Sequence, residues 1–140
     1  MGILNFKTFT ELSKKKPAFE IKVERLKTKE ENNRFYDKDQ DLFFFYVRIY
    51  IDIRESSPEY YSLEDVELVK YKLHETFPDR IRISDEGKNG FELKIWTYGF
   101  FEVETSIFLK HGKSTTIHGK VKFDVTLEEI QKNGAEELSI

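Results

Sequence analysis

Two loops of this chain are predicted to place hydrogen-bonding and aromatic side chains directly after strands. In the first, His74, Thr76 and Phe77 follow an alternating apolar segment that ends at Leu73. The imidazole can donate or accept a hydrogen bond and orient a neighbouring hydroxyl or ring. A structural interpretation stays open, in which His74 caps backbone groups of the loop and Phe77, before Pro78, is buried beneath it. The first loop therefore offers either one edge of a binding site or a well-filled corner.

The second loop follows another alternating segment, which runs from Gly90 to Trp96. It contains Thr97, Tyr98 and Gly99. For Trp96 itself we favour packing on the outer face of the sheet. Both loops thus carry aromatic and hydroxyl groups at the ends of strands.

The order of these two motifs resembles the YEATS domain. The first reads Leu-His-Glu-Thr-Phe-Pro from Leu73, and the second, beyond a hairpin, reads Trp-Thr-Tyr-Gly-Phe-Phe from Trp96. The resemblance covers roughly residues 42–125 and is closer to the prokaryotic branch of the family. Eukaryotic members read acylated lysine side chains between two such loops. The resemblance therefore implies an immunoglobulin-like β-sandwich that acts as a non-enzymatic binding module, with a protein or peptide carrying an acylated lysine as its partner.

The resemblance also implies a role for individual residues. His74 would line the pocket, the Thr76 hydroxyl would hydrogen-bond the acyl amide, and the rings of Phe77 and Tyr98 would form opposite walls. Two flat rings that face each other favour a thin, planar or extended group. Each stacked contact contributes about 0.5–1.5 kcal/mol beyond burial, so we expect binding in the micromolar range or weaker.

Two positions depart from the pattern of the family. Thr76 stands where the family has Ser, which keeps the hydroxyl, and Thr97 stands where the family usually has Gly, which would narrow the pocket or alter the loop. Gly99 would allow close backbone approach. The ligand-binding residues implied in this way are His74, Thr76, Phe77, Thr97, Tyr98 and Gly99.

The composition argues against several other classes of protein. A chain of 140 residues makes one domain. Its charged residues (35%) are evenly mixed and its formal net charge is −3, so nucleic-acid binding is disfavoured. There is no cysteine, which fits a reducing cytoplasm and removes disulfides and thiolate chemistry. Because no window approaches the ~20 apolar residues of a membrane helix, we expect a soluble cytoplasmic protein with no membrane partner.

Catalytic and metal-binding patterns are weak. The three histidines, His74, His111 and His118, lie in separate segments, so a metal site would require distant loops to coincide. No phosphate loop, nucleophile elbow or His-Glu-x-x-His motif occurs. An enzyme would need a reactive group beside His74, and only Thr76 is near in sequence. We therefore expect no catalytic residues, no metal and no cofactor.

Strands are the elements that must position the two loops. Alternating residues predict about seven to eight of them, and polar turns between strands without long helices favour an antiparallel sandwich. The segment Thr28 to Asp41 is predicted as a solvated loop, with Phe35 and Tyr36 tucked against the edge of the core. Asp85 to Gly90 is predicted as a turn. The predicted strands are Phe19 to Glu24, Leu42 to Ile53, Val66 to Leu73, Phe91 to Ile95, Phe101 to Leu109 and Ile117 to Val125.

The ends of the chain are predicted to be helical or extended. Residues 1–18 form an amino-terminal arm or short helix, residues 19–125 the sandwich, and residues 126–140 a short helix and tail. Thr126 would cap the last helix and Gly134 would end it.

A different class of function fits the same pattern. Phe44, Tyr46 and Tyr50 share the face of their strand that points away from the core. On this alternative the chain is a structural or scaffolding subunit, and these rings pack against a second chain. The oligomeric state is expected to be a monomer or a weak dimer.

Overall fold

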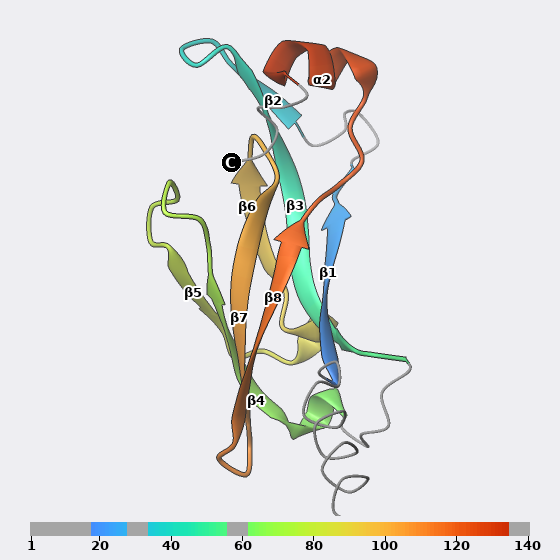
Figure 1. Ribbon diagram of the computed structural model, residues 1–140, viewed down its shortest axis with the longest axis vertical. Coiled ribbons are helices and arrows are strands. Elements are labelled where there is room, and N and C mark those ends of the chain that lie inside the picture. The colour runs from blue at the N-terminus through green and yellow to red at the C-terminus, as the bar shows by residue number, and fades with distance from the viewer. Residues whose placement is uncertain (1–17, 28–33, 56–61, 135–140) are drawn as a thin grey trace, which may run out of the picture.

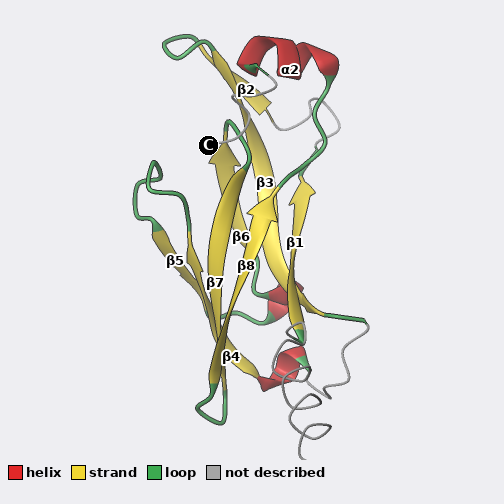
Figure 2. Ribbon diagram, in the orientation of Figure 1, coloured by secondary structure: helices red, strands yellow, loops and turns green. Residues whose placement is uncertain are grey.

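Two antiparallel sheets pack against each other around one core (Figures 1 and 2). The structure is a computed structural model that describes residues 18–27, 34–55 and 62–134. In the first sheet, the central strand β3 (Leu42–Ile53) pairs with β1 (Phe19–Arg25), β2 (Arg34–Asp37) and β6 (Leu93–Thr97). The strand order of the second sheet is β5 (Ile81–Ser84), β4 (Val66–Lys72), β7 (Phe101–Leu109) and β8 (Ser114–Val121). The predicted all-β sandwich is confirmed.

Alternation along the long strands builds the core. Every second residue of β3 is buried from Phe45 to Ile51, as predicted, and the ends of this face at Phe43 and Ile53 are half-buried. Leu73, directly after β4, belongs to the same core. The opposing sheet contributes Val69, Tyr71, Phe101, Val103 and Ile107.

Three short helices complete the described residues. Helix α2 (Leu127–Asn133) has the predicted cap, since the Thr126 hydroxyl accepts from the Glu129 backbone and the Glu129 side chain accepts in return from Thr126. Gly134 ends the helix as predicted. The turns η1 (Leu63–Asp65) and η2 (Lys88–Gly90) are 3₁₀-helical. In η2, Asn89 (φ 59°) and Gly90 (φ 71°) have the positive φ that the predicted turn requires.

The prediction of a solvated loop from Thr28 to Asp41 is wrong in its second half. Residues 34–37 form β2, which pairs with the start of β3 and places Phe35 opposite Phe44. Their rings stack with centroids 5.1 Å apart. Phe35 and Tyr36 are not tucked against the core, because their exposed fractions are 46% and 40%. The polar residues between the aromatic pair and β3 make the turn of a hairpin, and residues 28–33 lie outside the described residues.

Strand β5 was not predicted at all. It has only four residues, and Ile81 and Ile83 both point to the solvent side with exposed fractions of 51% and 63%. They lie opposite Lys72 and Lys70 of β4, whose side chains also face outward. The segment Ile-Arg-Ile-Ser does alternate, but four residues are too few for a clear pattern, and its apolar residues face solvent rather than the core.

The remaining boundaries agree in part. The last strand ends at Val121 rather than Val125, although Phe123 and Val125 continue to pack on the core. Most of the predicted amino-terminal arm, residues 1–17, and the predicted tail, residues 135–140, lie outside the described residues.

One buried hydrogen bond ties β4 to the start of β6. The hydroxyl of Tyr71, which is 0% exposed, donates to the Phe91 carbonyl at 2.7 Å, and burial raises the pKa of this hydroxyl. Phe91 has a left-handed backbone (φ 55°) and a buried ring. We expect Tyr71→Phe to lower the free energy of unfolding by about 1–3 kcal/mol, because the carbonyl loses its partner. Urea denaturation against Tyr50→Phe measures this, and equal effects of the two changes would contradict it.

Candidate functional site

The two predicted loops meet at one end of the sandwich. His74, Thr76 and Phe77 lie between β4 and β5, and Tyr98 and Gly99 lie between β6 and β7. The second loop crosses from one sheet to the other, since β6 belongs to the sheet of β3 and β7 to the sheet of β4. This crossing brings residues from both sheets to the same corner.

A pocket of about 350 Å³ lies between these loops. Four of the six predicted residues line it, and they are Thr76, Phe77, Thr97 and Tyr98. The rings of Phe77 and Tyr98 are half-buried. The other described residues of the lining are Gln40, Phe44, Pro78 and Trp96, and none of the eight is charged. The site is therefore a mostly aromatic cavity whose described lining carries two threonines and one glutamine.

His74 does not line the pocket, contrary to the expectation from the resemblance, but it holds the first loop. Its Nδ1 lies 3.0 Å from the Thr76 hydroxyl oxygen and accepts a 3.3 Å hydrogen bond from the Thr76 backbone. The Phe77 backbone N–H donates to the His74 carbonyl at 3.0 Å. With the imidazole proton on Nε2, the hydroxyl of Thr76 donates to Nδ1 and its oxygen keeps lone pairs for a guest N–H. His74 thus does what the capping interpretation predicted, and it also orients a pocket residue.

Thr97 braces the second loop internally. Its side chain is 1% exposed, and its hydroxyl donates to the Gly99 carbonyl at 2.9 Å and accepts from the Gly99 N–H at 3.3 Å. The hydroxyl is therefore committed to the loop rather than offered to a guest. Asn133 of α2 donates to the Tyr98 carbonyl at 3.1 Å from the other side. Gly99 itself is buried and does not line the pocket.

Ring contacts connect the aromatic residues of the pocket to one another and to the core. Phe77 packs on the core ring of Phe101 with centroids 4.9 Å apart, and Tyr98 meets Phe44 edge to face at 5.7 Å. Trp96 stacks on Tyr46 at 4.8 Å and is 41% exposed, so it lies on the outer face of the sheet as predicted, while it also lines the pocket. These contacts hold the walls in place before any guest enters.

Sequence reasoning missed Gln40, Phe44, Pro78 and Trp96 as pocket residues. Phe44 was placed correctly on the outward face of its strand, but its neighbours across the sheet depend on register. The two-residue spacing of Trp96 and Tyr98 indicates that both side chains lie on one face of the sheet. The register of β3 with β6 then places Phe44 on that same face. Gln40 comes from the β2–β3 hairpin, whose first strand was not predicted.

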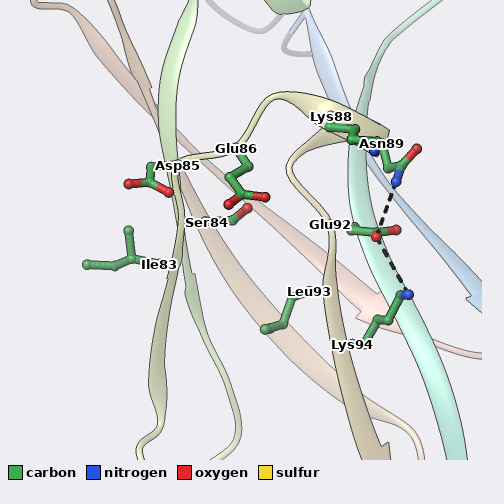
Figure 3. A pocket seen from close by; sticks show the side chains of 9 residues that line it. All are labelled: Ile83, Ser84, Asp85, Glu86, Lys88, Asn89, Glu92, Leu93 and Lys94. Atoms are coloured by element: carbon green, nitrogen blue, oxygen red, sulfur yellow. Dashed lines mark hydrogen bonds and ion pairs between the residues drawn. The ribbon is translucent and has the colours of Figure 1, made fainter.

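A larger hollow of about 530 Å³ lies between β5 and β6 and has a different character. Figure 3 shows Glu92 linked to Asn89 and to Lys94, and Asp85 and Glu86 at the other side. Arg48 also pairs with Glu92. Ile83 and Leu93 are the apolar residues of this lining. It contains none of the residues selected by the two motifs, and a larger share of its lining is polar than in the pocket between the loops.

Metal sites and membrane-spanning helices are absent from the part of the chain that the structure describes. No group of three or more His, Asp or Glu side chains there has the arrangement of a metal site. No helix among the same residues has the length and apolar character needed to cross a membrane.

The fold and this corner define a β-sandwich with an aromatic pocket between two strand-end loops. The sequence pattern of the prokaryotic YEATS domain matches residues 45–121, and the chain belongs to this family. The match spans both loops and ends before α2. The resemblance stated from the two motifs is thereby confirmed.

The chain is similar to solved structures at low sequence identity. "The Yaf9 YEATS domain Recognizing H3K122suc Peptide" is 13% identical, with a TM-score of 0.50 over 79% of this chain and 72% of that chain. The Yaf9 YEATS domain bound to H3K27ac is 15% identical, with a TM-score of 0.49 over 79% and 72%. The yeast AF-9 homolog Yaf9 is 14% identical, with a TM-score of 0.48 over 76% and 69%. No curated protein matches the sequence of this chain.

Proposed function

We propose that this chain is a non-enzymatic binding module that takes an acylated lysine, or a similar planar amide on a protein, into the pocket between its two loops. The observation that carries the proposal is that Phe77 and Tyr98, from separate loops, line one pocket of about 350 Å³. The partner is then a protein or peptide. The solved Yaf9 YEATS domain that recognises an H3K122suc peptide is consistent with such a partner.

The chemistry of the lining favours a neutral guest over a lysine ammonium. Acylation removes the positive charge of lysine. An unmodified ammonium would lose hydration in this pocket and meet no carboxylate among the described lining residues. The Thr76 oxygen, oriented by His74, supplies an acceptor for the amide N–H of an acylated lysine. A flat amide between two rings then satisfies both the apolar and the polar parts of the lining.

Peptide titration tests this function. Fluorescently labelled peptides that carry acetyl-lysine or crotonyl-lysine are compared with the same peptide bearing unmodified lysine or trimethyl-lysine. We expect micromolar or weaker binding of the acylated peptides and much weaker binding of the two cationic ones. Trimethyl-lysine is included because aromatic rings alone attract such cations. Equal binding of all four peptides, or no binding of acylated peptides at millimolar concentration, would overturn the proposal.

The exposed aromatic side chains favour a second candidate function. Phe35 is 46% exposed, and its ring contacts Phe44 and Trp96 on the outer face of the sheet of β3. Tyr46 extends this surface through its stack on Trp96. A contiguous exposed apolar surface is a common site of protein association. On this alternative the chain is a scaffolding subunit that pairs through this face.

Sedimentation separates the two candidates. The scaffolding function predicts a dimer that dissociates when Tyr46 is changed to Glu, because a carboxylate would then be buried in the interface. The binding function predicts a peptide complex in the wild type regardless of the oligomeric state. A dimer lost in Tyr46→Glu, without any peptide binding, would favour scaffolding.

A further inference from the structure

Asn133 at the end of α2 is buried, and its side chain makes three hydrogen bonds. Its exposed fraction is 4%. Its Oδ1 accepts from the Phe43 N–H at 2.8 Å, and its Nδ2 donates to the Phe43 carbonyl at 3.0 Å and to the Tyr98 carbonyl at 3.1 Å. Both amide protons are therefore used, and one of them holds the backbone of a pocket residue.

The side chain of Asn133 takes the place of a missing strand. β6 stops pairing with β3 at Thr97, which lies opposite Phe45. Two residues before Phe45 in β3, Asn133 bonds both the N–H and the carbonyl of Phe43, as a paired strand would. The third bond bridges from this position to Tyr98, at the point where the chain leaves β6. The side chain of Asn133 in α2 thus satisfies the backbone hydrogen-bonding groups of β3 that β6 leaves unpaired beside the pocket.

The other end of α2 is fixed by buried charges. Glu129 is 0% exposed and pairs with Arg25 of β1 at 2.7 Å and with Arg34 of β2 at 2.8 Å. The helix begins at Leu127, after the Thr126 cap. With its first turn held against β1 and β2, the helix presents Asn133 to β3 and to the second loop in one orientation.

We propose that Asn133 is a positioning residue of the binding pocket, which holds the Tyr98 backbone so that the ring forms a wall opposite Phe77. The position of Asn133 follows from its hydrogen bonds. Its effect on peptide binding rests on the proposed function. The Thr97 hydroxyl braces the loop through Gly99, and Asn133 braces it through Tyr98. Since Asn133 lies outside residues 45–121, this brace comes from a part of the chain beyond the family match.

Amide hydrogen exchange without ligand tests the positioning role directly. Asn133→Ala removes all three bonds, whereas Asn133→Asp keeps only the acceptor for Phe43. We expect the Gly99 N–H to exchange at least about tenfold faster in both variants, because the loop loses its bond to Tyr98. Gln131→Ala, an exposed change on the same helix, should leave this rate unchanged. Tyr71→Phe provides a variant of lowered global stability with an intact loop.

Peptide affinity tests the consequence for the pocket. We expect both Asn133 variants to bind the acetyl-lysine peptide at least about fivefold more weakly than Tyr71→Phe and Gln131→Ala. If Gly99 exchanges in the Asn133 variants at the same rate as in Tyr71→Phe, the positioning role is overturned. It is also overturned if the wild type binds the peptide and the Asn133 variants bind it with the same affinity. If the wild type binds no acylated peptide, the proposed function fails, and the exchange rates still decide whether Asn133 positions the loop.

Discussion

Replacing Glu129 with Gln is expected to lower the free energy of unfolding by about 3–5 kcal/mol, the range measured when one partner of a buried ion pair is removed. The carboxylate is 0% exposed and receives hydrogen bonds from Arg25 and Arg34. The Arg25 side chain is itself only 5% exposed. Glutamine removes the negative charge that faces both guanidinium groups and puts an amide N–H₂ group where an acceptor was.

A neighbouring glutamate provides the control for this change. Glu128 lies 3.7 Å from Arg34, but its side chain is 69% exposed. We expect Glu128→Gln to cost less than about 1 kcal/mol, as solvent screens such a pair. Urea denaturation at neutral pH compares the two variants. Similar losses in both would show that burial does not strengthen the Glu129 cluster.

The same group predicts a dependence of stability on pH. Burial acts to raise the pKa of Glu129, but hydrogen bonds from Arg25, the Thr126 backbone and Arg34 outweigh it and lower the pKa from 4.5 to about 2. Because the pKa of Glu129 is lower in the folded state than in the unfolded state, its ionisation stabilises the fold. This stabilisation is fully present above the unfolded pKa and is lost as the pH falls toward 2. Its size is on the order of 3 kcal/mol. As the pH falls from 4.5 toward 2, the free energy of unfolding should fall more in the wild type than in Glu129→Gln. Parallel plots of this free energy against pH would argue against a lowered pKa of Glu129.

The second large effect is expected at the pocket wall. Tyr98→Ala should weaken binding of the acetyl-lysine peptide at least about tenfold, which corresponds to about 1.4 kcal/mol. The Tyr98 side chain lines the pocket, and aromatic contacts contribute about 0.5–1.5 kcal/mol in addition to the apolar area that they cover. Its backbone bond to Asn133 does not involve the ring and can remain. Fluorescence anisotropy with the labelled peptide measures the change.

Tyr50→Ala is the matched control for Tyr98→Ala. Tyr50 is a tyrosine on the outward face of β3, where Arg48 lies over its ring at 3.8 Å, and it does not line the pocket. Its removal should leave peptide affinity within a factor of about two of the wild type. If the two alanine variants bind equally, the loss at Tyr98 cannot come from the pocket.

The parts of the fold that follow from local patterns were predictable. From Leu42 to Ile53 apolar residues occupy every second position, and this pattern predicted the strand with its observed bounds. In the structure these residues are buried or half-buried. Thr126 and Gly134 provided the start and stop signals for α2. The two loops were predicted from the motif residues, which lie where strands end.

The parts that depend on tertiary contacts were not predictable in the same way. Strand β5 exposes Ile81 and Ile83, so its pattern lacks a buried face. Phe44 joins the pocket only through the register of β3 with β6. Asn133 reaches Phe43 across 90 positions of the sequence and Tyr98 across 35, distances at which no local pattern applies.

A crystal structure with an acetyl-lysine peptide tests the central claim most directly. We predict density for the acyl group between the rings of Phe77 and Tyr98, with the Thr76 hydroxyl oxygen about 2.7–3.2 Å from the amide nitrogen. A peptide bound instead to the exposed aromatic face around Phe35 and Tyr46, with the space between those two rings empty, would contradict it.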